Sequence, residues 1–389
     1  MKALLPLLLA ACCLAVASAQ DAMPTVASGF TIERIGTVNG ARELAVAPNG
    51  DLFVGTSRDD VDLLPQADSA HPGPAHVFAT FDSKPAAGVT LGDGALFVGT
   101  QFGVYRIPYQ TGDQKPRGAP VKLLSVRLSG IARDHVTTTL AVVGDTLFAS
   151  VGSSCNACRP ELDSTRATIQ RFDLLRHVAT DEAYNIRNAI ALAVNPETQT
   201  LWAGVAGADD LPLYHPYEIF DAVSVHPDPV DYGWPACYEN RKHFEKWSGD
   251  CAKTPIPRVV FPAYETPIGA VFYPVGAHGA HAFPAAYRGG AFVTLHGSWH
   301  GPAQGLSGYV PPRVVFVPMH GDTPDRAVDW DDPTAQWQPF VTGYQNGGTS
   351  ERIGRPTGIA VGPDGSVFVA DDQTGAIYRI RPRLTVDRS

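Results

Sequence analysis

The feature that most constrains this chain is a short pattern that returns six times along it. Each copy is an alternating apolar run, a tight turn and a second apolar run that ends in small residues. Such alternation around Asn-Gly or Asp-Gly predicts a β-hairpin, because these pairs accept the positive φ of a two-residue turn. The clearest copies are residues 43–56, 88–100 and 358–371, and the weaker ones are residues 139–152, 190–204 and 270–295, the last with an insert.

A hairpin of this size cannot bury its own apolar face, so repeated hairpins predict a stack or ring of units. We expect an all-β fold, a six-bladed β-propeller that forms a single domain over residues 20–389. Blades of roughly 40–50 residues would occupy most of the chain. The intervals between the later copies are longer, which places large loops in the fourth and fifth blades.

The first 19 residues have the pattern of a signal peptide. Lys2 precedes an apolar run over residues 3–16, and Ala17-Ser18-Ala19 is a small-residue cleavage site. We expect cleavage after Ala19 and a periplasmic or secreted protein. The alternative is a lipoprotein cleaved at Cys12. The run is too short for a stable membrane span, and no other segment looks transmembrane.

The net charge of the chain limits the classes of molecule that it can bind. The formal net charge of −9 argues against nucleic acid, because binding to phosphates needs a basic surface. Beyond this, the charge is consistent with an ordinary soluble acidic enzyme.

Four cysteines follow the signal peptide, and four cysteines permit three pairings. Pairing of Cys155 with Cys158 and of Cys237 with Cys251 is the simplest in an oxidising compartment. Cys155 and Cys158 could instead form a redox or metal pair. The chain has no second Cys-x-x-Cys and no His after Cys158, which favours a structural disulfide over zinc or covalent haem.

Polar residues that interrupt the repeats are the candidate site, because propeller sites lie on loops at one end of the central channel. If they occupy matching ends of different blades, the ring brings them around one axis and forms a cationic, aromatic-lined pocket for a planar anion. The structural alternatives are a capping histidine, an ion pair between blades and a packed tryptophan. The candidates are His135 in Arg133-Asp134-His135, Arg187 with Asn188, His296, Trp299 and Arg355.

Residues 206–211 place Asp209 and Asp210 beside small residues. Ca²⁺ takes carboxylate and backbone carbonyl oxygens, so this loop is a candidate cation site.

With these segments, the chain resembles the pyrroloquinoline-quinone (PQQ) sugar dehydrogenases of the soluble glucose dehydrogenase and L-sorbosone dehydrogenase type. The resemblance covers most of residues 30–382. It is most specific at Arg187-Asn188 and at residues 232–235, 283–299 and 354–358, and the sorbosone dehydrogenase branch is the more similar. The family fold is a six-bladed propeller, as the repeats also predict.

The resemblance implies a role for each matched residue. His135 would be the general base on the sugar C1 hydroxyl, while hydride passes to C5 of PQQ. Arg187 would stabilise negative charge on the quinone oxygen O5. The backbone carbonyls of Gly207 and Ala208 would hold Ca²⁺, which acts on the quinone as a Lewis acid.

The residues that would hold the cofactor itself are Arg187, Asn188, His296 and Arg355. The ring of Trp299 could stack against an aromatic ligand. The chain departs from glucose dehydrogenase in three places. Residues 83–86 lack a glutamine that contacts sugar and cofactor, residues 152–155 lack an acidic neighbour of the catalytic histidine, and Thr357 stands where a second arginine would be.

The predicted function is that of a quinoprotein that oxidises an aldose or sugar aldehyde at C1. The chain contains no Cys-x-x-Cys-His, so electrons would pass to a separate acceptor such as a cytochrome c or a quinone. Two alternatives remain open: a Ca²⁺-dependent lactonase-type propeller hydrolase, and a propeller binding module that has lost PQQ.

Overall fold

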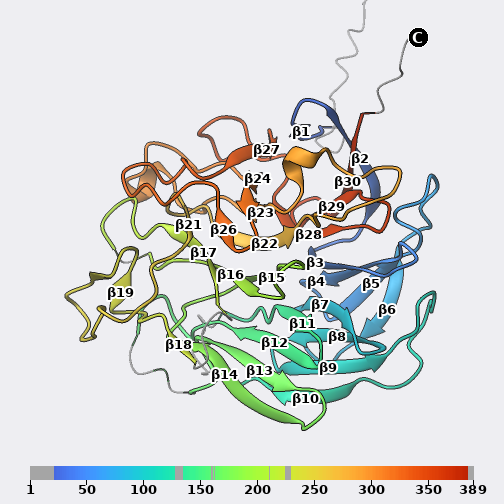
Figure 1. Ribbon diagram of the computed structural model, residues 1–389, viewed down its shortest axis with the longest axis horizontal. Helices are drawn as coiled ribbons and strands as arrows, with labels where there is room; N and C mark the ends of the chain where they lie inside the picture. The colour runs from blue at the N-terminus through green and yellow to red at the C-terminus, as the bar shows by residue number, and fades with distance from the viewer. Residues whose placement is uncertain are drawn as a thin grey trace, which may run out of the picture.

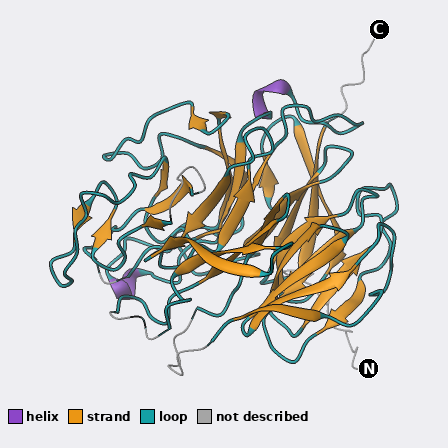
Figure 2. Cartoon of the chain, turned by 60° about the horizontal axis from the view of Figure 1, so that its bottom comes forward, coloured by secondary structure: helices purple, strands orange, loops and turns teal. Residues whose placement is uncertain are grey.

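The computed structural model describes residues 22–127, 135–158, 161, 163–209, 211–223 and 229–383. The predicted signal peptide, the Arg133-Asp134 pair and Asp210 lie outside the described residues. In the described ranges the regular structure is all strand, except for two short 3-10 helices, η2 (Ala285–Tyr287) and η3 (Pro302–Gln304), so the predicted all-β class is confirmed (Figure 2). No helix in these ranges is long and apolar enough to cross a bilayer.

Four-strand antiparallel meanders follow one another along the chain (Figure 1). The first two contain β3 (Ala41–Val46), β4 (Leu52–Thr56), β5 (Asp60–Leu64) and β6 (His76–Thr80), then β7 (Ala86–Gly92), β8 (Ala95–Thr100), β9 (Gly103–Pro108) and β10 (Val121–Ser125). The next two contain β11 (Leu140–Val143), β12 (Thr146–Val151), β13 (Thr168–Asp173) and β14 (Val178–Tyr184), then β15 (Ala191–Val194), β16 (Leu201–Val205), β17 (Glu218–Ala222) and β21 (Val259–Phe261). The last two contain β22 (Pro267–Phe272), β23 (Ala291–Leu295), β24 (Arg313–Val317) and β27 (Gln338–Thr342), then β28 (Pro356–Val361), β29 (Val367–Asp371), β30 (Ala376–Pro382) and β2 (Phe30–Thr37).

Short strands extend or decorate these sheets. β1 (Thr25–Val26) pairs with β27, and β18 (Val230–Asp231) pairs in parallel with β14. Two small separate hairpins are formed by β19 (Cys237–Tyr238) with β20 (Lys242–His243) and by β25 (Met319–His320) with β26 (Thr323–Pro324).

Each repeat copy found in the sequence forms the first hairpin of a meander. The turn glycines adopt the positive φ that the Asn-Gly and Asp-Gly pairs predicted: 83° at Gly50, 62° at Gly94 and 93° at Gly365. The hairpin prediction is therefore confirmed at the level of strand pairing.

Strands near the middle of the sheets are buried on both faces, whereas outer strands such as β10 and β14 are partly exposed. Alternation alone would leave one face of a strand in water, but β4 and β8 are buried along their whole length. The reason is that each sheet packs between two others. Phe53 packs in one cluster with Leu96 and Val98 of the next meander, and Leu52 packs in another with Phe368 of the last one.

The first strands of the meanders form a closed ring around an axis. β3 contacts β7 and β28, β11 contacts β7 and β15, and β22 contacts β15 and β28. Figure 1 shows these strands nearest the middle of the molecule, with their sheets spread outward, which is a β-propeller arrangement. Residues of all these first strands line a central channel of about 380 Å³.

Candidate active site

The residues predicted from the sequence lie at one end of this ring. His135, Arg187 and Arg355 precede the first strands β11, β15 and β28. Because neighbouring strands are antiparallel, the same end receives the residues after the second strands. Gly207 and Ala208 follow β16 in this way, and His296 and Trp299 follow β23, so His296 belongs to a second strand and not to an equivalent position before a first strand.

His135 is held by the loop that follows β12. Its backbone N–H donates to the carbonyl of Ser153 at 3.0 Å, and its Nδ1 lies 2.9 Å from the same carbonyl and 3.0 Å from Ser153 Oγ. The Ser153 hydroxyl donates its own hydrogen to Cys155 O, so both partners of Nδ1 are acceptors. Nδ1 therefore carries the proton, and Nε2 is the atom that can accept one.

Arg187 is 8% exposed and is held by hydrogen bonds to two loops. Its Nε and Nη2 donate to the backbone O and side-chain Oδ1 of Asn156 at 3.0 and 2.9 Å, and Nη1 donates to Ala206 O at 3.1 Å. Its Nη2 also lies 3.9 Å from Asp209 Oδ2. The structural alternative for Arg187 was an ion pair between blades. Instead, Arg187 bonds mainly to carbonyl oxygens.

His135 and Asn188 meet over Gly152. A Cβ at Gly152 would lie 2.5 Å from His135 Cβ and 2.6 Å from Asn188 Oδ1. Only glycine leaves room for these two side chains to approach from neighbouring meanders, which explains a glycine at the end of β12.

The 206–209 loop combines backbone carbonyls with a carboxylate. Gly207 N–H donates to Glu218 Oε2 at 2.6 Å, and burial raises the pKa of Glu218 to about 7. Asp209 Oδ1 lies 3.5 Å from His300 Nε2. Among the described residues no hydrogen bond to the carbonyls of Gly207 or Ala208 is found, so both oxygens suit a cation.

His296 lies in a network with Asp372 and Arg42. Its Nε2 is 3.1 Å from both Asp372 carboxylate oxygens, and Arg42 Nη1 is 3.0 Å from Oδ2. Burial lowers the pKa of His296 to about 4, although the Asp372 hydrogen bond acts in the opposite direction. His296 is therefore neutral at pH 7 and donates its Nε2 hydrogen to Asp372, so it supplies no positive charge.

The positive charge at this end comes from arginines. Arg355 donates from Nε to His296 O and from Nη2 to Gly297 O, each at 3.1 Å. Burial lowers its pKa to about 10, which still leaves it charged at pH 7. Arg352 donates to Ser298 O and Arg42 pairs with Asp372, so three arginines surround the 296–298 segment.

Trp299 and Thr357 occupy contrasting environments. Trp299 is 66% exposed, and its ring lies 3.9 Å from the His300 ring, so one face is open to a ligand. Thr357 is fully buried and donates its hydroxyl to Ala41 O, which ties β28 to β3. The position that the resemblance assigns to a second arginine thus has a structural role here.

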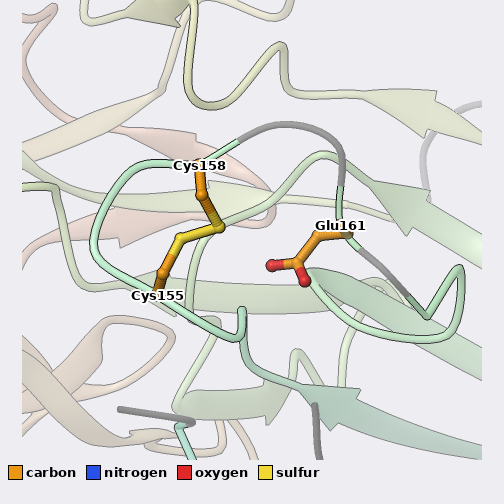
Figure 3. A group of neighbouring side chains, drawn as sticks. All are labelled: Cys155, Cys158 and Glu161. Atoms are coloured by element: carbon orange, nitrogen blue, oxygen red, sulfur yellow. A yellow bond between two sulfur atoms is a disulfide. The ribbon is translucent and has the colours of Figure 1, made fainter. Parts of the chain in front are cut away.

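Both predicted disulfides are present, Cys155–Cys158 and Cys237–Cys251. The Cys155, Cys158 and Glu161 side chains lie close enough to suggest a metal site (Figure 3). The sulfurs are bonded to each other, however, and Glu161 accepts hydrogen bonds from Ser154 N and Oγ at 2.8 and 2.6 Å. These three residues therefore have a structural role: the disulfide and the Glu161 hydrogen bonds hold this loop in its conformation.

Sequence reasoning missed several residues of this site. Asn156 lies inside the Cys-x-x-Cys segment, where only the cysteines drew notice, and Asp372 follows the last repeat copy directly. Arg42 directly precedes the first copy and lies on β3, whereas Arg187 lies three residues before the fourth copy and ahead of β15, so no common position pointed to Arg42. His300 and Glu218 carried no comparable signal.

Comparison with known proteins finds a matching family model and one distant relative. Residues 236–383 match the family model described as TrAA12-like. An uncharacterized protein of Borreliella burgdorferi is 24% identical over 237 residues, which cover 60% of this chain and only 56% of that relative.

Solved structures share the fold at low identity. The calcium structure of the Trichoderma reesei carbohydrate-active enzyme of family AA12 is 18% identical with a TM-score of 0.75, covering 92% of this chain and 97% of that one. The holo form of the PQQ domain of Coprinopsis cinerea pyranose dehydrogenase is 17% identical with the same score and coverage. The apo form of the soluble aldose sugar dehydrogenase of Escherichia coli is 15% identical with a TM-score of 0.64, covering 91% and 100%. The resemblance seen in the sequence is confirmed.

Proposed function

We propose that this chain is a PQQ-dependent dehydrogenase that oxidises an aldose or a sugar aldehyde at C1 by hydride transfer to PQQ. The observation that carries the proposal is the link through Ser153, at one end of the ring, between His135, with Nε2 as its proton-accepting atom, and the buried Arg187. Ser153 O accepts from His135 Nδ1, and Ser153 N–H donates to Arg187 O. A general base and a fixed positive charge are the groups that removal of a hydroxyl proton and of a hydride requires.

The residues present fit the cofactor. PQQ is a planar triacid, and Arg42, Arg352 and Arg355 supply fixed positive charge for carboxylates. The exposed face of Trp299 could contact a flat ring system. His296 would act as a neutral hydrogen-bonding group positioned by Asp372.

The residues also fit Ca²⁺. The carbonyls of Gly207 and Ala208 and the carboxylate of Asp209 form an all-oxygen set on one short loop, which suits a hard cation. When bound, PQQ accepts the hydride and Ca²⁺ acts as a Lewis acid on its quinone.

In this proposal His135 removes the proton of the C1 hydroxyl through Nε2, with Ser153 fixing the tautomer at Nδ1. Arg187 stabilises the negative charge that develops at the quinone oxygen, and its low exposure keeps water away from that charge. Asn188 approaches His135 over Gly152 and would orient the cofactor.

We further propose that the propeller has six blades, one for each meander, and that a separate acceptor such as a cytochrome c or a quinone takes the electrons. The two disulfides support an oxidising compartment, periplasmic or extracellular.

The test is reconstitution. Purified apoprotein is mixed with PQQ, with and without Ca²⁺, and dye reduction is followed with a panel of aldoses. We expect a change in PQQ absorbance and sugar-dependent turnover that both require Ca²⁺. No change in absorbance and no turnover would overturn the proposal, and hydrolysis of lactones that depends on Ca²⁺ without PQQ would favour a lactonase.

A further inference from the structure

We propose that Asn156 is a positioning residue that couples Arg187 to the 206–209 loop, and that the Cys155–Cys158 disulfide holds it in place. Among the described residues, Asn156 accepts four hydrogen bonds from three partners. Its backbone O accepts from Arg187 Nε and Trp234 Nε1, at 3.0 and 3.2 Å. Its side-chain Oδ1 accepts from Arg187 Nη2 and the backbone N–H of Asp209, at 2.9 and 2.8 Å.

These bonds fix both the direction and the position of the Arg187 guanidinium. Two neighbouring N–H groups of the planar fork point at two oxygens of one residue, so rotation of the guanidinium would break both bonds. The third bond, from Nη1 to Ala206 O, leads to the same loop that Asn156 holds through Asp209 N–H. A shift of Asn156 therefore moves the proposed charge-stabilising group and the proposed cation loop together.

The Asn156 loop is itself anchored on both sides. Ser153 N–H donates to Arg187 O at 2.7 Å and Ser153 Oγ donates to Cys155 O at 2.6 Å, which links the loop to His135 as well. On the other side Glu161 holds Ser154. The disulfide closes the loop after only three residues in sequence, so Asn156 keeps little conformational freedom (Figure 3).

The substitutions follow from the four bonds. Asn156→Ala removes Oδ1, and with it the bonds to Arg187 Nη2 and Asp209 N–H, but keeps the backbone carbonyl. Asn156→Asp retains an acceptor of the same shape at Oδ1. Asn195→Ala is the control, because Asn195 also bonds to distant residues through its side-chain amide, donating to Gly321 O and Asp322 Oδ1 at the opposite end of the ring. Asn195 is buried and Asn156 is half-buried, so the control removes an amide that packs at least as tightly.

The first measurement needs neither cofactor nor substrate. Apoprotein is treated with an arginine-specific dicarbonyl reagent, and modification of Arg187 is followed by peptide mass spectrometry. We expect Arg187, only 8% exposed, to react faster in Asn156→Ala than in the wild type, and at the wild-type rate in Asn156→Asp and Asn195→Ala. Mild reduction of the Cys155–Cys158 disulfide should have the same effect as Asn156→Ala. Equal rates in all proteins would overturn the coupling, whatever becomes of the proposed function.

The second measurement rests on the proposed function. In reconstituted enzyme, Asn156→Ala should lower kcat about 10- to 100-fold with little change in the KM for sugar, since misplacement of a catalytic group acts on the transition state. It should also weaken Ca²⁺ binding, and Asn156→Asp should recover part of kcat. A variant with wild-type kcat and Ca²⁺ affinity would refute the role. If no protein shows turnover but Arg187 is modified faster in Asn156→Ala, the proposed dehydrogenase activity is refuted. The coupling of Arg187 to the 206–209 loop would still be supported.

Discussion

Glu43 gives the sharpest test of the physical reasoning, because it is a carboxyl group in an apolar channel. It lies on β3 and lines the central channel with Leu44, Val89, Leu140 and other apolar residues. It is 9% exposed, and Oε1 has no hydrogen-bond partner in the described part of the chain. Burial raises its pKa from 4.5 to about 8, although the neighbouring Arg42 acts in the opposite direction.

The sign of the pH dependence follows from this shift. Above pH 4.5 the unfolded chain releases the Glu43 proton while the folded protein keeps it. The free energy of unfolding therefore falls as pH rises. From 4.5 to 8 the difference is 3.5 pKa units, which at about 1.4 kcal/mol per unit gives an upper limit of about 5 kcal/mol, with about 3 kcal/mol already lost at pH 7. Above pH 8 the loss is complete and stays constant.

Glu43→Gln removes this titration and keeps the shape of the side chain. We therefore expect the free energy of unfolding of the variant, relative to the wild type, to rise by several kcal/mol between pH 5 and pH 9. Urea denaturation of both proteins at closely spaced pH values measures this difference. Other carboxyls with raised pKa values, such as Glu218 and Glu265, are present in both proteins, so their contributions cancel in the difference. A difference that stays constant over this range would show that Glu43 ionises normally and that the reasoning is wrong.

Four further predictions concern the site. His135→Ala should leave PQQ bound, as judged by absorbance, and lower kcat by about 10²–10⁴, while unchanged turnover would remove His135 from the base role. Gly152→Ala should destabilise the protein by about 1–3 kcal/mol in thermal unfolding, because its Cβ would overlap His135 and Asn188; an unchanged Tm would contradict the close packing. Asp209→Asn should weaken Ca²⁺ binding measured by calorimetry without PQQ, and an unchanged affinity would place the cation elsewhere. Asp372→Asn should weaken PQQ binding in an absorbance titration by releasing Arg42 and His296, and a wild-type affinity would exclude that positioning role.

The sequence predicted the parts of the fold that depend on short-range pattern. Turn pairs such as Asn49-Gly50 fix a hairpin locally, so the hairpins could be predicted one by one. The local disulfides followed from spacing and compartment in the same way. The burial of β4 on both faces could not be predicted, because it depends on sheets from distant parts of the chain.

Within the site, the position of a residue at a strand end was predictable but its partners were not. Asp372 is 76 residues from His296, on the next meander along the chain, and 330 residues from Arg42, which only closure of the ring brings to it. The neutral state of His296 depends on its burial, which follows from tertiary packing and not from the local sequence. Asn156 could not be identified from the sequence, because its backbone bonds do not depend on residue type and the donors to its Oδ1, Arg187 and Asp209, are 31 and 53 residues away.

The pairing of β2 with β30 has a consequence for when the active site can exist. The final sheet takes one strand from the start of the chain and three from its end, and the Arg42–Asp372 ion pair crosses the same seam. A nascent or truncated chain that lacks β30 has nothing with which β2 can pair, so it cannot complete the arginine cluster even when every other sheet has formed. The ability to bind an anionic cofactor would then appear only after synthesis of the last strand. A protease cut that frees either terminal strand would abolish cofactor binding although it lies far from His135 in the sequence.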